Sequence, residues 1–153
     1  MLQNLNHARI AHQTWVRRAD HLISGLPVNK EHIPLEAISC AFGKSFLYGE
    51  VGEKIRAHKD YEHIMYHIET LHTSLHSYYT SIYKIYFVLP QKRSLLFKIT
   101  HIGNTKEVTK KEIAEAQIYF TLLQNVSIEL VGLLNKLSLE IKSSSEFFTS
   151  FKE

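Results

Sequence analysis

The spacing of apolar residues near the C-terminus constrains the fold most strongly. From Thr109 onward, large apolar side chains recur in steps of three and four, which places them on one face of an α-helix. Thr109 and Glu112 form a capping-box pattern, so we expect the helix to begin there. The expected seam consists of Ile113, Ala116, Phe120, Leu123, Leu130, Leu134, Leu137 and Ile141. Such a seam is typical of the shallow helix crossings in a four-helix bundle.

The rest of the chain also favours helices. Its 153 residues have the length of one domain, and they include only six glycines and three prolines. We predict a first helix over about 2–23, a second from Pro34 until Gly49 and Gly52 loosen or end it, and a third that Asp60 caps and Pro90 ends or kinks. The predicted fold class is all-α, a single four-helix-bundle-like domain over 1–153.

Two stretches depart from this pattern. Residues 85–106 combine β-branched and aromatic runs around a polar turn, so they fit a hairpin as well as extensions of the neighbouring helices. We treat them as an irregular insertion between the third and the last long helix. The tail, about 143–153, is rich in serine and is expected to fray.

Charge and hydropathy exclude several classes of protein. The formal charge of +3 comes from 18 basic and 15 acidic residues spread along the chain, without the basic run of a nucleic-acid-binding arm. No stretch resembles a signal peptide or approaches the about 18 apolar residues of a membrane span. We therefore expect a soluble, cytoplasmic protein that binds neither nucleic acid nor membrane.

Histidine is the unusual component of the composition, with ten residues. His72 and His76 lie four residues apart on the third predicted helix, so both rings share one face and can grip a single ion. His63 and His67 have the same spacing but point about 180° away from that face. His12 lies within the apolar stripe of the first helix, where an imidazole needs a polar partner.

Cys40 adds a fourth ligand type from another predicted helix. It is the single cysteine of the chain, so it acts through metal binding, reactivity or packing, not through an internal disulfide. Taken singly, His12 and Cys40 fit a hydrogen-bonded core histidine and a small buried hydrophobe. Taken together with His72 and His76, they match the nitrogen and sulfur ligands of a tetrahedral zinc ion. Four protein ligands leave no open position for an activated water, so we expect no enzyme.

These residues and their neighbours resemble a known family. The chain reads His12-Gln-Thr-Trp15, then Cys40-Ala-Phe-Gly43-Lys44, then His72-Thr-Ser-Leu-His76. In order and approximate spacing, residues 5–83 resemble the chemoreceptor zinc-binding (CZB) domains of bacterial chemoreceptors and diguanylate cyclases.

The resemblance implies a function and a set of site residues. One zinc ion per chain would be held by His12, Cys40, His72 and His76, with Trp15, Phe42, Gly43 and Lys44 around them. The domain would form a helical-bundle homodimer that passes zinc or oxidant signals to an output domain in chemotaxis or cyclic di-GMP control. No receptor or cyclase domain is present in these residues, so we expect a second copy and a separately encoded chemoreceptor or diguanylate cyclase as partners.

The chain departs from the family pattern in two places. Ser45 stands where the family commonly has tryptophan, so the packing around Cys40 is expected to be looser or filled by Phe46. The stretch 85–106 is an insertion relative to the compact family core.

Two other functions stay open at this point. Zinc can be purely structural, in a dimerisation or protein-interaction module that senses nothing. A hemerythrin-like di-iron bundle would use His58 with Glu62 and His72 with His76, although these pairs are too close in sequence to lie on separate helices. A zinc protease is excluded, because Thr73 stands where the H-E-x-x-H pattern needs its general base.

Overall fold

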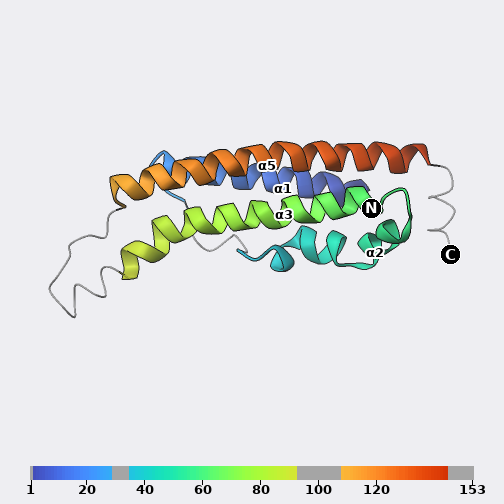
Figure 1. Ribbon diagram of the computed structural model, residues 1–153, viewed down its shortest axis with the longest axis horizontal. Helices are drawn as coiled ribbons and strands as arrows, with labels where there is room; N and C mark the ends of the chain where they lie inside the picture. Colours follow the sequence, from blue (N-terminus) through green and yellow to red (C-terminus); the bar gives the residue numbers. More distant parts are fainter. Residues whose placement is uncertain (1, 29–34, 93–107, 145–153) are drawn as a thin grey trace.

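The computed structural model describes residues 2–28, 35–92 and 108–144, and over these residues the fold is all-α, as predicted. Three long helices form the body of the bundle: α1 (Leu2–Ile23), α3 (Glu62–Tyr83) and α5 (Lys110–Ser143). Figure 1 shows that α5 lies along α1 and α3 and runs antiparallel to both. The remaining side of the bundle is formed by residues 35–57, which run along α3 in the opposite direction.

Residues 35–57 do not form the single helix predicted from Pro34 to Gly49. They contain a 3-10 turn, η2 (Ala37–Ser39), a π-helical turn, η3 (Gly43–Leu47), and the short helix α2 (Glu50–Ala57). Pro34 itself lies outside the described residues.

Two glycines explain this break. A Cβ atom on Gly43 would overlap the carbonyl oxygen of Ala37, and one on Gly52 would overlap the carbonyl oxygens of Phe46 and Leu47. The backbone of each short element therefore lies directly against the element before it, which only glycine permits. Gly52 lies inside α2 and does not end a helix.

The start of α3 is close to its predicted position. Its N-cap is Tyr61, not Asp60, whose carboxylate instead lies 3.8 Å from Nδ1 of His58. Eight side chains of α3 are buried, and they include His72 and His76.

Pro90 does not end the third helix. The helix passes from Tyr83 into a π-helical turn, η4 (Lys84–Val88), and continues through Pro90 to residue 92. A proline lacks the N–H of a regular helical bond and its ring clashes with a carbonyl one turn earlier. The wider turn, in which Leu89 N–H donates to the Lys84 carbonyl, accommodates this change. Residues 85–92 thus extend the helix, and the rest of the expected insertion lies outside the described residues.

The predicted start of α5 is confirmed. The Thr109 hydroxyl accepts a hydrogen bond from Glu112 N–H at 3.3 Å, and the Glu112 carboxylate accepts one from Thr109 N–H at 2.8 Å. Every predicted seam residue is buried except Ile113, which lies in the first turn at the edge of the seam and is 41% exposed. The tail beyond residue 144 lies outside the described residues.

The expectation that no stretch approaches a membrane span needs a correction for α5. By length and mean hydropathy, 1.2 over its most apolar window, it is the one described helix that would suit a span. A core helix of a bundle meets the same criteria, and the seam of α5 packs against α1 and α3. Only 28% of that window is buried, so much of its apolar surface faces outward.

Candidate metal centre

Three of the four predicted ligands, His12, His72 and His76, form one group between α1, α3 and the turn η3, and Cys40 contacts this group through His72. His12 comes from the middle of α1, His72 and His76 come from one face of α3, and Cys40 lies shortly before η3. All four side chains are at most 4% exposed. One ring nitrogen from each histidine lies within 4.8 Å of those of the other two, which is close enough for the three to hold one metal ion.

The thiol of Cys40 faces this group of imidazoles. Its Sγ lies 3.2 Å from Nε2 of His72. When a sulfur and a nitrogen bind one tetrahedral zinc ion, at about 2.3 Å and 2.0–2.1 Å, the two atoms are about 3.5 Å apart. This pair of atoms is thus close to the separation of two zinc ligands, but Cys40 does not belong to the group of three imidazoles, so its sulfur would have to move closer to the other imidazoles to complete a four-ligand site.

The imidazole rings meet edge to face and do not stack. The ring centroids of His72 lie 5.2 Å from those of His12 and 4.7 Å from those of His76, with interplanar angles of 83° and 74°. Rings at such angles can direct nitrogen atoms toward a common point without overlapping.

His76 is oriented by a backbone carbonyl. Its Nδ1 lies 3.1 Å from the carbonyl oxygen of Leu35, and because a carbonyl only accepts, Nδ1 carries the proton and donates it. Thr80 donates to the same oxygen at 3.2 Å. This fixes the ring and leaves Nε2 as the nitrogen with a lone pair, an arrangement typical of metal-binding histidines.

Burial controls the protonation of the two groups in contact. Desolvation lowers the pKa of His72 to about 3, helped by the nearby His12 and His76, so His72 is neutral at pH 7 and able to bind a metal. Desolvation raises the pKa of the Cys40 thiol, opposed by the N–H groups of Gly43 and Phe42 and by the charge of Lys44. Because the net effect raises its pKa, the thiol keeps its proton in the absence of a bound metal, and a bound metal would replace that proton.

Aromatic side chains surround the group. The ring of Trp15 meets the edge of His76 with centroids 4.4 Å apart, and it also contacts His12. Phe42 contacts both His12 and His72, with centroids 5.3 Å and 5.2 Å away. Both aromatic residues are buried, so they keep water from the imidazoles.

The remaining neighbours of Cys40 act in different ways. The N–H of Gly43 donates to Sγ of Cys40 at 3.1 Å, and the same glycine allows the close turn. Lys44 is exposed, and its charge reaches the thiol without a direct hydrogen bond from its amine. Phe46 is fully buried and stacks on Phe42 at 5.1 Å, so it fills space beside the cysteine.

The other histidines of the chain that the structure describes do not join the group. The rings of His63 and His67 lie 4.3 Å apart, but both side chains are exposed on another face of α3. His58 and Glu62, the pair required for a di-iron site, lie outside the group as well. Among the described residues no carboxylate belongs to it, which removes support from the di-iron hypothesis.

Sequence reasoning missed two residues that help to orient His76, namely Leu35 and Thr80. The Leu35 carbonyl could not be identified, because a backbone group leaves no mark in the residue types. Thr80 had a weak signal, since it follows His76 by four residues and therefore lies on the same face of α3.

Comparison with known proteins gives no relative: no family model, no curated protein and no solved structure matches this chain.

Proposed function

We propose that this protein is a zinc-binding regulatory module of the CZB type, in which His12, Cys40, His72 and His76 hold one zinc ion per chain. The observation that carries the proposal is the convergence of three buried imidazoles from two helices, with a buried thiol from a third segment in contact with one of them. The hydrogen bond from His76 to the Leu35 carbonyl supports it further.

The ligand types favour zinc. Neutral imidazoles and a thiolate suit a borderline-soft ion, whereas magnesium and calcium prefer oxygen. With four protein ligands the ion has no open position for water, so the site is regulatory or structural and not catalytic.

Zinc would act by tying α1, α3 and residues 35–57 together. An ion that binds only the closed arrangement stabilises it by RT ln(1 + [Zn]/Kd), about 4 kcal/mol at a thousandfold excess over Kd. Oxidation of the Cys40 sulfur would remove one ligand and open the same contacts, which gives oxidants a second route to the same change.

Metal analysis tests the ligand assignment. The purified protein should carry one zinc per chain, and the variants Cys40→Ser and His76→Ala should lose most of it. The variant His67→Ala is the matched control, because it removes an exposed histidine of the same i, i+4 type from the same helix. Stoichiometric zinc in both ligand variants would refute the assignment.

The competing function is a structural zinc site, which the near-complete burial of the four side chains favours. A strong chelator separates the two functions. If the helices remain after zinc is stripped while subunit packing or partner binding changes, the site is regulatory; if the whole chain unfolds, it is structural.

A second copy of this chain is the partner we expect on the outward face of α5. Ile118 and Ile128 are 63% and 74% exposed there, and residues 116–135 contain Glu129 as their single charged residue. A homodimer would cover this surface and would account for its apolar character without a membrane. The signal would then reach a chemoreceptor or a diguanylate cyclase through the dimer.

Light scattering tests this arrangement. The protein should have the mass of a dimer, and Ile128→Glu should shift it toward the monomer. Ile10→Glu, which places the same charge at another exposed isoleucine on α1, should leave the dimer intact. A monomeric parent protein would refute the homodimer.

A further inference from the structure

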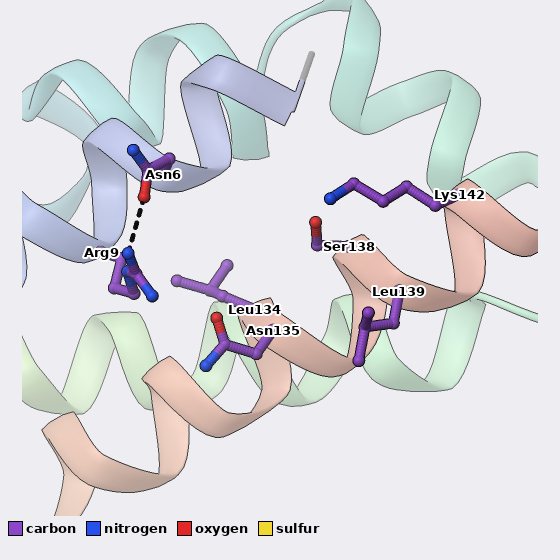
Figure 2. A pocket seen from close by; sticks show the side chains of 7 residues that line it. All are labelled: Asn6, Arg9, Leu134, Asn135, Ser138, Leu139 and Lys142. Atoms are coloured by element: carbon purple, nitrogen blue, oxygen red, sulfur yellow. Dashed lines mark hydrogen bonds between the residues drawn. The ribbon is translucent and has the colours of Figure 1, made fainter.

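A polar pocket lies between α1 and α5, apart from the metal centre (Figure 2). Its volume is about 530 Å³, within the range of about 300–1,000 Å³ that is common for small-molecule sites. Asn6 and Arg9 line it from α1, and Asn135, Ser138 and Lys142 line it from α5. None of the proposed zinc ligands belongs to it.

The charges around this pocket are all of one sign. Arg9 and Lys142 line it from opposite helices, and none of the lining residues is acidic. Among the described residues neither side chain forms an ion pair. Two cations that share a cavity without a counter-charge repel each other and attract an anion.

Arg9 is prepared for an oxygen ligand. Its Nη2 donates to Oδ1 of Asn6 at 2.8 Å, which holds the guanidinium in place (Figure 2). Its Nε is closed to solvent and has no hydrogen-bond partner among the described residues, so a ligand in the pocket would meet the Nη groups of Arg9 and not Nε. The Nη groups of a guanidinium bind the oxygens of a carboxylate or phosphate group well.

We propose that this pocket binds the phosphate group of a small molecule. Arg9 would supply the planar donors, Lys142 a second charge, and Asn135 and Ser138 neutral hydrogen bonds. A phosphate group, with more oxygens and a higher charge than a carboxylate, makes better use of two cations and several donors. Leu139, an exposed leucine that also lines the pocket, offers an apolar surface to the rest of the molecule.

Binding of simple phosphates tests the proposal. Inorganic phosphate and glycerol 3-phosphate would be titrated into the zinc-loaded protein at constant ionic strength, with NMR detection of the backbone N–H signals of the pocket residues on α1 and α5. We expect saturable binding and a shift of these signals. Absence of saturation, or binding of acetate as tight as that of phosphate, would overturn the phosphate site.

Charge variants separate a built pocket from general attraction. Lys142→Gln, at an exposed position where folding is not at risk, should weaken phosphate binding about tenfold. Arg9→Gln should weaken phosphate binding more. Arg9→Lys should keep only part of the affinity, because lysine has the charge but lacks the planar guanidinium. Lys136→Gln and Arg17→Gln remove the same charge from α5 and α1 outside the pocket and should change affinity less than about twofold. Equal weakening by Lys136→Gln and Lys142→Gln would refute the pocket.

Because none of these residues is a proposed zinc ligand, the phosphate site and the zinc site can each fail without the other.

Discussion

The α5 side of the bundle and the side formed by residues 35–57 reach the core in different ways. Along α5 one regular seam supplies fully buried residues such as Leu123 and Leu130 over the whole length of a helix of 34 residues. Residues 35–57 contribute Phe46 and Ile55 from two tight turns and a helix of only eight residues. So short a helix is not stable in water by itself, and this side depends on what holds it to its neighbours.

Polar contacts with α3 hold residues 35–57 at both ends. Near the end of α2, Arg56 approaches Glu69 of α3 at 3.4 Å, and within the segment it donates to the Leu47 carbonyl at 3.0 Å. At the other end, the Leu35 carbonyl accepts from His76 and Thr80, and Cys40 lies against His72. The comparison teaches that a metal ion can matter greatly for one side of this bundle and little for the other.

Removal of zinc should have the largest effect on stability, and this effect should be concentrated in residues 35–57. At zinc concentrations a thousandfold above Kd, stripping the ion lowers the free energy of unfolding by about 4 kcal/mol. Hydrogen exchange should then accelerate in residues 35–57, with little change in residues 116–141 of α5. Equal acceleration of hydrogen exchange in residues 35–57 and in α5 would show that the two sides do not differ in their dependence on zinc.

A cavity in the α5 seam should act without regard to zinc. Leu130→Ala removes a fully buried side chain and should cost about 2–5 kcal/mol in urea denaturation, in both the zinc-bound and the zinc-free protein. Ile10→Ala, at a half-exposed position of α1, should cost less than about 1 kcal/mol. A cost for Leu130→Ala that disappears without zinc would show that the two sides are not independent.

Acid should destabilise the zinc-free protein through His72, one of the candidate metal ligands. His72 has a pKa of about 3 in the folded protein against 6.5 as its ordinary value, so between these values the unfolded chain binds the proton and the folded chain does not. Stability should therefore fall as the pH drops below about 6.5, by up to about 1.4 kcal/mol per pH unit from this group. Denaturation of His72→Gln should show a smaller slope with pH, and the exposed control His63→Gln an unchanged one.

Loss of the α5 cap should have the smallest effect. Thr109→Ala removes the hydroxyl that accepts from Glu112 N–H and should cost about 1 kcal/mol, with or without zinc. Thr121→Ala is the matched control within α5, where its hydroxyl bonds only to the carbonyl one turn earlier. A thermal melt that ranks the control as the more damaging change would contradict the role of the cap.

The sequence predicts the α5 side well because its signals are local. The spacing from Ala116 to Ile141 and the capping box depend on residues within a few positions of one another, and the structure has both. The facing directions of His72 and His76 follow from helical geometry in the same way.

The other side could not be predicted in detail, because its form depends on contacts between distant backbone segments. Gly43 and Gly52 permit the close approach of neighbouring turns, but a glycine in a sequence indicates equally well a helix end. The turn around Cys40 and the contact of His76 with the Leu35 carbonyl therefore required the structure.

The position of the candidate metal centre along the helices has a mechanical consequence for the proposed zinc site. His12 lies at the middle of α1, so about 15 Å of helix extends on either side of it. A zinc ion bound there, as proposed, would tie the middle of α1 to α3 and residues 35–57, and a change in its occupancy would swing the two ends of α1 in opposite directions across α5. The displacement at those ends would exceed the displacement at the ligands, as the arms of a lever magnify movement near its fulcrum.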